Sequence, residues 1–210
     1  MNKARTFFTD AELRRIEETT RAVECCTIGE VAAMVVDSSD QYADTELLGG
    51  IFLGSFVSLL VTVFFFQSSL WFYIPFSILF SLPCRLLFRK VLPLKRSLIG
   101  AGRIEAAVRQ RAVQAFYEKE LYRTRKNTGV LFFISLLEHK VWVLADKGIY
   151  EKIDQQTLNT FAQAVSRGIK EGRACDALCQ AIKDAGEILA KHFPLIPGDT
   201  NELSDRVMTE

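Results

Sequence analysis

Residues 47–84 read LLGGIFLGSFVSLLVTVFFFQSSLWFYIPFSILFSLPC and contain no charged residue. A helix that spans a bilayer needs roughly 20 apolar residues. The stretch therefore predicts two spans, residues 47–66 and 70–88, joined by a polar turn at Gln67–Ser69. We expect an integral membrane protein with a transmembrane helical hairpin that contacts the lipid bilayer.

Small residues recur at every fourth position of the first span, at Gly50, Gly54 and Ser58. In lipid this spacing lets two helices approach closely. The partner in that contact is either the second span or another membrane protein. The sequence favours the second span, which follows directly.

Basic residues flank the apolar stretch on both sides. They are Lys3, Arg5, Arg14 and Arg15 before it, and Arg85, Arg89, Lys90, Lys95, Arg96 and Arg103 after it. Cationic flanks stay on the cytoplasmic side of a membrane, so both ends of the chain are predicted to face the cytoplasm. The five cysteines lack the spacing of a disulfide framework, which agrees with a reducing compartment.

Composition argues against nucleic-acid binding, and one pair of cysteines is a possible metal site. A net charge of +1 argues against a nucleic-acid-binding protein. Cys175 and Cys179 are four residues apart and share a face of a predicted helix. Two metal ligands could be placed in this way, but small buried residues that pack against a neighbour fit the pattern better.

Hydrophobic periodicity outside the hairpin alternates between helix and strand. It predicts helices over residues 10–24, 101–125, 155–170 and 173–192, and strands over residues 30–36, 130–136 and 141–145. Thr9 and Glu12 form a capping box before the first helix.

The order of these elements predicts the topology. The first strand reaches the second through a helix, which favours a parallel pair with a right-handed crossover. A short connection makes the third strand antiparallel to the second. We predict an α/β fold, a small mixed β-sheet packed by helices, with the membrane hairpin inserted. The domain then consists of residues 1–46 and 89–210, interrupted by the hairpin at 47–88.

One edge of this sheet gathers oxygen-bearing side chains. Asn127 and Thr128 precede the second strand, Asp146 follows the third, and Glu30 begins the first. Hard cations prefer such oxygen ligands, so these four residues are a candidate site for Ca²⁺ or Mg²⁺. The alternative is that they are ordinary turn and cap residues.

A second acidic group, Asp37, Asp40 and Asp44, is predicted at the opposite edge of the sheet. It could hold a cation or contact lipid headgroups through one. A solvated junction between strand and helix is the simpler interpretation, in which Asp40 or Ser39 caps the following helix.

Several short motifs follow one another in a recognisable order. They are Thr27, Gly29 and Glu30; Arg111, Ala112 and Phe116; TGVLFFISL (128–136); VWVLADKGI (141–149); HFP (192–194); and NELSD (201–205). In this order and spacing the chain resembles the TPM domain family. That family includes thylakoid proteins of photosystem II repair, a nematode receptor-associated protein and many bacterial membrane proteins.

The resemblance implies an α/β sandwich, divalent-cation binding in a crevice and an acid-phosphatase activity attributed to plant members. By position, the turns at 127–129 and 146–148 match the most recognisable segments of the family. This chain departs from many members because its hairpin lies inside the domain. It also has basic residues, Arg125 and Lys126, where further acidic ligands would be expected.

The chain shows no standard catalytic signature, neither a phosphate-binding glycine loop nor a nucleophile elbow. We therefore expect a membrane-tethered accessory module that binds another membrane protein and aids its assembly or turnover, rather than an enzyme. The alternative is a metal-assisted phosphatase with Glu30 and Asp146 as ligands and Thr128 as a helper.

Overall fold

The computed structural model describes the chain except residues 1–2, 66–69, 92–95, 125 and 197–201. The predicted turn at Gln67–Ser69 lies outside the described residues, as do Lys95, Arg125 and Asn201. The chain divides into two compact units. One comprises Met1–Ser39 and Glu105–Glu210, and the other comprises Asp40–Ile104.

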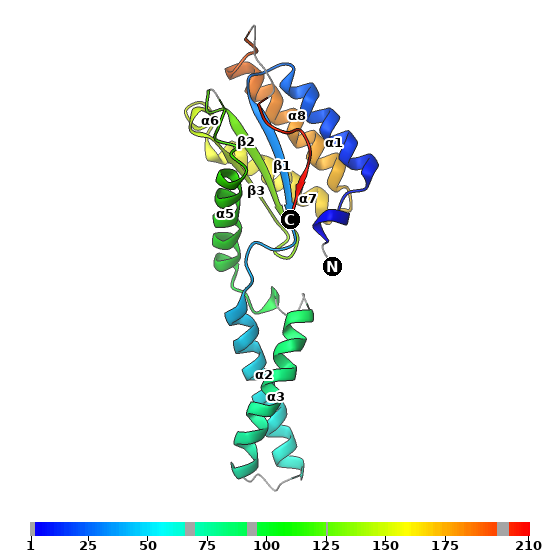
Figure 1. Ribbon diagram of the computed structural model, residues 1–210, viewed down its shortest axis with the longest axis vertical. Coiled ribbons are helices and arrows are strands. Elements are labelled where there is room, and N and C mark those ends of the chain that lie inside the picture. The colour runs from blue at the N-terminus through cyan, green and yellow to red at the C-terminus, as the bar shows by residue number, and fades with distance from the viewer. Residues whose placement is uncertain (1–2, 66–69, 92–95, 125, 197–201) are drawn as a thin grey trace. The chain divides into compact units, whose positions relative to one another are not determined.

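The first unit contains a four-stranded mixed sheet (Figure 1). Its strands, in the spatial order β3-β2-β1-β4, are β3 (Lys140–Ala145), β2 (Gly129–Ser135), β1 (Glu30–Val36) and β4 (Met208–Thr209). β1 runs parallel to β2, and β3 runs antiparallel to β2. The predicted strands and their directions are confirmed.

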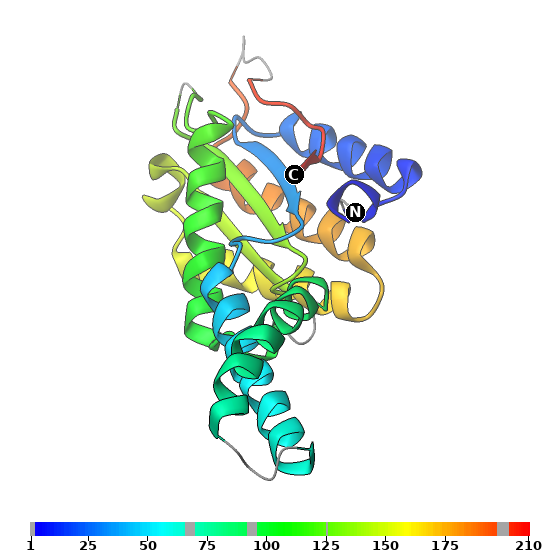
Figure 2. The same cartoon turned by 60° about the horizontal axis from the view of Figure 1, so that its bottom comes forward.

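Every residue of β1 and β2 is buried, so both faces of the sheet are covered. One face packs on α1 (Asp10–Glu24), α7 (Gln155–Lys170) and α8 (Ala174–His192). Figure 2 shows α5 (Ala101–Glu118) crossing the other face. Continuous apolar strands are what a sheet covered on both faces requires, and the predicted sandwich is confirmed.

Local signals set the limits of several helices. α1 begins where predicted, because the Thr9 N–H donates to Glu12 Oε2 (2.8 Å) and the Glu12 N–H donates to Thr9 Oγ1 (3.3 Å).

α7 and α8 carry the predicted apolar stripes, with Leu158 and Leu178 fully buried. Cys175 and Cys179 are buried in the same core, as packing residues would be.

Two expectations were wrong, and one strand was not predicted. The helix predicted over residues 101–125 ends at Glu118, because Glu120 adopts a positive φ of 56° and turns the chain so that Leu121 becomes buried. A short helix, α6 (Lys147–Tyr150), follows β3 where only a turn was expected. The C-terminal residues contribute β4, a strand that the sequence analysis did not predict, which pairs in parallel with Met34 and Val35 of β1.

The second unit consists mainly of two packed helices, α2 (Ala43–Phe65) and α3 (Leu70–Lys90). A Cβ added to Gly50 would lie 2.8 Å from Arg85 Cα, and one added to Gly54 would lie 2.6 Å from the Ser81 nitrogen. Ser58 is fully buried, and its hydroxyl donates to the Tyr73 carbonyl (2.9 Å). The small-residue seam therefore faces the second helix, as the sequence favoured.

The outer surface of this helix pair is apolar. The large side chains with the highest exposure include Phe52 (78%), Phe64 (78%) and Trp71 (89%). Two helical stretches, Ala43–Phe65 and Trp71–Arg89, are long and apolar enough to cross a membrane.

Candidate functional site

The four predicted ligand residues lie at one edge of the sheet. Glu30 stands opposite Gly129 in the β1–β2 register, and the Asp146 N–H donates to the Gly129 carbonyl (2.8 Å). Asn127 and Thr128 lead directly into β2. The topology that the sequence predicted thus brings these segments together, but their side chains are held by separate partners.

Glu30 and Thr128 bind backbone groups. Glu30 is buried, and its carboxylate accepts the N–H groups of Glu202 (3.1 Å) and Leu203 (3.3 Å). The Thr128 hydroxyl donates to the Ile28 carbonyl (2.9 Å), and its N–H donates to Thr124 Oγ1 (2.8 Å). Both side chains fasten neighbouring segments to the edge of the sheet.

Asn127 and Asp146 shape the turns. Asn127 has a positive φ of 54°, and its carbonyl accepts the Gly148 N–H (3.1 Å). A Cβ on Gly148 would lie 2.7 Å from that carbonyl oxygen, so this close approach requires glycine. Asp146 Oδ1 accepts the Lys147 N–H (2.7 Å) as the N-cap of α6, while Oδ2 is buried without a hydrogen-bond partner.

These contacts match the alternative interpretation of turn and cap residues. Within the described part of the chain, no three His, Cys, Asp or Glu side chains are grouped so that they could hold a metal ion. The assignment of Glu30, Asn127, Thr128 and Asp146 to Ca²⁺ or Mg²⁺ stays a prediction.

A carboxylate cluster that the sequence analysis missed lies next to Glu30. It consists of Glu24 at the end of α1, Glu30 and Asp205 of the C-terminal segment. Burial, followed by the charges of Glu30 and Asp205, raises the pKa of Glu24 to about 8. A cation, Arg21, joins the cluster through Nε, which lies 3.1 Å from Asp205 Oδ2.

The cluster fixes the path of the C-terminal segment. Glu24 Oε1 accepts the Val31 N–H (2.9 Å), while Glu30 holds residues 202 and 203. No local pattern reveals this arrangement, because Glu24 and Asp205 come from opposite ends of the sequence. The only trace in the sequence is the acidic NELSD motif in the tail.

The opposite edge of the sheet is a junction organised by Asp37. Its Oδ1 accepts the Ala4 N–H (2.6 Å), its carbonyl accepts the Leu137 N–H (3.0 Å), and its own N–H donates to the Glu210 carbonyl (3.3 Å). Asp37 therefore joins both ends of the chain to the β2–β3 turn, which agrees with the simpler interpretation of this acidic group as a junction.

Asp40 and Asp44 belong to the second unit, where Arg103 pairs with both. Arg103 Nη2 lies 2.9 Å from Asp44 Oδ1 and 3.7 Å from Asp40 Oδ2, and the guanidinium group lies 5.6 Å from the centre of the Tyr42 ring. These aspartates thus have a cation supplied by the chain itself.

Beside the Asp37 junction, a buried carboxylate is fully engaged. Glu138, only 1% exposed, accepts the Ser39 N–H (2.9 Å) and the Ser135 hydroxyl. The Ser39 hydroxyl donates in turn to Ser135 Oγ (2.8 Å). This network attaches Ser39, the last residue of the first unit before the chain enters the helix pair, to the end of β2.

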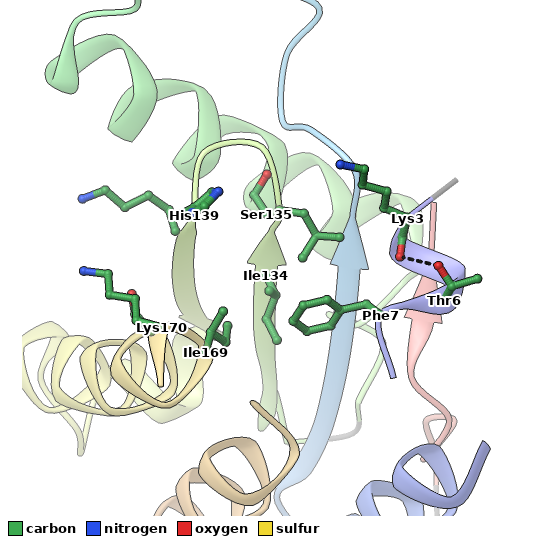
Figure 3. Close-up of a pocket in the computed structure, with 11 residues that line it drawn as sticks. Lys3, Thr6, Phe7, Ile134, Ser135, His139, Ile169 and Lys170 are labelled. Atoms are coloured by element: carbon green, nitrogen blue, oxygen red, sulfur yellow. Dashed lines mark hydrogen bonds between the residues drawn. The ribbon is translucent and has the colours of Figure 1, made fainter. Parts of the chain in front are cut away.

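The same edge of the sheet carries a cavity of about 660 Å³ (Figure 3). Its walls come from the N-terminal segment, the end of β2, the β2–β3 turn and the end of α7. The lining residues are Lys3, Thr6, Phe7, Ile134, Ser135, Leu136, His139, Lys140, Ser166, Ile169 and Lys170. Sequence reasoning did not find this cavity, because its parts are distant in the chain.

Comparison with known proteins agrees with this architecture. The chain is similar to the BA42 protein from the psychrophilic bacterium Bizionia argentinensis, solved by NMR, with a TM-score of 0.62 and 19% sequence identity. The similarity covers 97% of this chain and 96% of that one, and at this identity it shows the fold alone. Among curated proteins, none matches the chain.

The fold is thus that of a known class of α/β sandwich domain. A sequence model described as the TPM domain matches residues 97–188, from the approach to α5 through most of α8. This part of the chain is therefore similar to the TPM domain family, the same family that the motifs in the sequence indicated.

Proposed function

We propose that this chain is a membrane-tethered TPM module that binds another membrane protein and aids its assembly or turnover, with its α/β unit in the cytoplasm. One observation carries the proposal. A pair of apolar helices is inserted between β1 and β2 of the TPM fold, and the two helices pack against each other through glycines of α2. Both chain connections of the α/β unit therefore lead into the helix pair.

The surface of the helix pair supports insertion into lipid. Side chains such as Phe52, Phe64 and Trp71 are far more exposed than aromatic side chains in a water-soluble protein. Two polar side chains of the pair, Ser58 and Thr62, are buried and donate to carbonyls of the pair. This is the distribution expected for helices that a bilayer surrounds.

The cytoplasmic orientation rests on the basic flanks and on the cysteines. Arg85 and Arg89 lie at the end of α3, and no charged residue lies between Glu46 and Arg85. All five cysteines are free thiols.

A partner-binding role is supported by an exposed aromatic pair at the C-terminal end of α5 and just beyond it. Tyr117 is 61% exposed and Tyr122 is 39% exposed, with ring centres 5.4 Å apart. Lys119 lies between them in the sequence, and Arg123 follows Tyr122. Tyrosine and arginine are both enriched at protein interfaces.

The proposal assigns no hydrolytic chemistry to the edge that carries Glu30 and Asp146. Their hydrogen bonds to backbone groups serve the fold. We expect the purified chain to leave a generic phosphomonoester intact, with and without Ca²⁺ or Mg²⁺. Cation-dependent hydrolysis that Asp146→Ala abolishes would contradict the proposal and favour the phosphatase alternative.

The topology can be tested on native membranes. The chain should remain in the membrane pellet after alkaline carbonate extraction. A membrane-impermeant maleimide should label the exposed thiols of Cys25 and Cys26 in inside-out vesicles but not in right-side-out vesicles. The control variant, with both cysteines replaced by serine, should lose this label. Extraction by carbonate, or labelling in right-side-out vesicles, would refute the topology.

The interaction role needs a separate test. A photo-crosslinking residue placed at Tyr117 should capture a defined membrane protein in cells. The same residue placed at Glu187, an exposed position on α8, serves as the matched control. Equal products at both positions, or no product at Tyr117, would contradict the proposed module.

A further inference from the structure

The cavity at the Asp37 edge has the size of a small-molecule site. Its volume of about 660 Å³ lies within the roughly 300–1,000 Å³ usual for ligand pockets. It lies entirely within the α/β unit, and the proposed module does not use it. Figure 3 shows Phe7 beside Ile134 on its floor, with Lys3 on one side and His139 and Lys170 on the other.

The charge of the lining is of one sign. Its titratable side chains are Lys3, His139, Lys140 and Lys170, and no aspartate or glutamate contributes to it. Among the described residues, no salt bridge joins any of these three lysines to a carboxylate, whereas Arg15, Arg103 and Arg111 are all paired. In a chain of net charge +1, these three lysines are a local concentration of positive charge.

Two acidic side chains at this edge of the sheet, Glu138 and Asp37, do not line the cavity. Glu138 belongs to the same turn as His139, but it is buried and accepts hydrogen bonds from Ser39 and Ser135. Asp37, at the adjoining junction, accepts the Ala4 N–H. The lysine ammonium groups are exposed and can approach an anion from both sides of the cavity.

The floor is apolar. Phe7, Ile134, Leu136 and Ile169 contribute to the lining, with Ile134 fully in the core and Phe7 half-buried. A free inorganic anion would make no use of this surface. A ligand that carries both an anionic group and a hydrocarbon portion would use both parts of the cavity.

A second cavity of about 240 Å³ shares two lining residues, Lys140 and Ser166, with the first. Its lining includes the acidic Glu105 and also Trp142, whose Nε1 is buried and has no hydrogen-bond partner. A buried N–H group of this kind requires an acceptor. An ester or phosphate oxygen that extends past Lys140 would supply one.

We propose that this cavity binds the headgroup of an anionic phospholipid. The phosphate lies among Lys140, Lys170 and His139, and the start of the hydrocarbon portion lies on Phe7 and Ile169. Ser39 is hydrogen-bonded to Ser135, which lines the cavity, and it lies only four residues before α2 begins at Ala43. We therefore favour a lipid as the source of the anion. This choice of source rests on the membrane anchoring proposed above.

The test uses the full-length chain in a neutral detergent, so that ligand binding is separated from membrane insertion. Short-chain phosphatidylglycerol is titrated while the melting temperature is followed, with short-chain phosphatidylcholine and inorganic phosphate as comparison ligands. A ligand that binds the native state raises the melting temperature. We expect phosphatidylglycerol to raise it by about 2–4 °C at roughly five times its Kd.

Paired variants connect this shift to the cavity. K140S/K170S should weaken the apparent affinity for phosphatidylglycerol by about tenfold or more. K140R/K170R should retain binding because it keeps both charges. The matched control is K183S/K191S, which removes two exposed lysines of α8 and should bind as the unaltered chain does.

The outcomes separate the possibilities. A shift that is equal for phosphatidylcholine and phosphatidylglycerol, or one that K140S/K170S leaves unchanged, would overturn the site. An equal shift with inorganic phosphate would overturn the lipid assignment. Loss of membrane retention in the carbonate experiment, with the phosphatidylglycerol shift intact, would refute the anchoring proposal but not the anion site.

Discussion

Replacing Glu24 by glutamine should stabilise this protein above neutral pH. Burial raises the pKa of the Glu24 carboxyl from its ordinary 4.5 to about 8, and the charges of Glu30 and Asp205 contribute to the rise. The folded state therefore holds a proton that the unfolded state releases. A glutamine keeps the acceptor for the Val31 N–H but carries no charge.

The sign and size of the effect follow from linkage. Because the folded-state pKa is raised, the contribution of Glu24 to stability is most favourable below pH 4.5, decreases as the pH rises, and reaches its full penalty above pH 8. Each tenfold change in proton affinity corresponds to about 1.4 kcal/mol, so the rise in the pKa of Glu24 corresponds to a loss of about 5 kcal/mol in the free energy of unfolding at high pH. Glu24 is only half-buried, so solvent screening reduces the expected penalty to about 2–3 kcal/mol.

The assay is thermal unfolding of the full-length chain in detergent between pH 5 and pH 9. Glu24→Gln should melt roughly 5–10 °C higher than the unaltered chain at pH 8, and the difference should shrink towards pH 5. Glu18→Gln, at an exposed position of the same helix, is the matched control and should leave the curve unchanged. A Glu24→Gln variant that is equally or less stable at pH 8 would refute the reasoning.

Two further predictions concern the seam and the junction. Gly54→Leu should separate the helices of the pair and lower the melting temperature in detergent, because even a Cβ would lie 2.6 Å from the Ser81 nitrogen. The control, Gly102→Leu, has open space at that position and should leave the melting temperature unchanged. Asp37→Ala should cost about 1–3 kcal/mol, because it leaves the Ala4 N–H without its acceptor. Hydrogen exchange at the Ala4 amide should become faster in Asp37→Ala and should stay slow in Gly54→Leu. Unchanged exchange in Asp37→Ala would contradict the assigned role of Asp37.

The candidate site shows where sequence reasoning succeeds and where it ends. The order of strands placed Glu30, Thr128 and Asp146 at one edge, and the register confirms that placement. What each side chain binds could not be predicted, because the partners of Glu30 are backbone groups of the distant C-terminal segment.

The sequence by itself determined the elements whose signals are local. An uncharged stretch predicted the apolar helix pair, a capping box set the start of α1, and apolar periodicity outlined the first three strands, α7 and α8. Each signal lies within a few turns of chain, where hydrogen-bond geometry and side-chain spacing act directly.

Only the tertiary structure decided the features that join distant segments. β4 has two residues and exists because β1 offers it a free edge. The Glu24–Asp205 contact and the basic cavity bring together residues that are more than 100 positions apart in the chain. Such contacts are set by how the whole core packs, and no periodicity in the sequence encodes them.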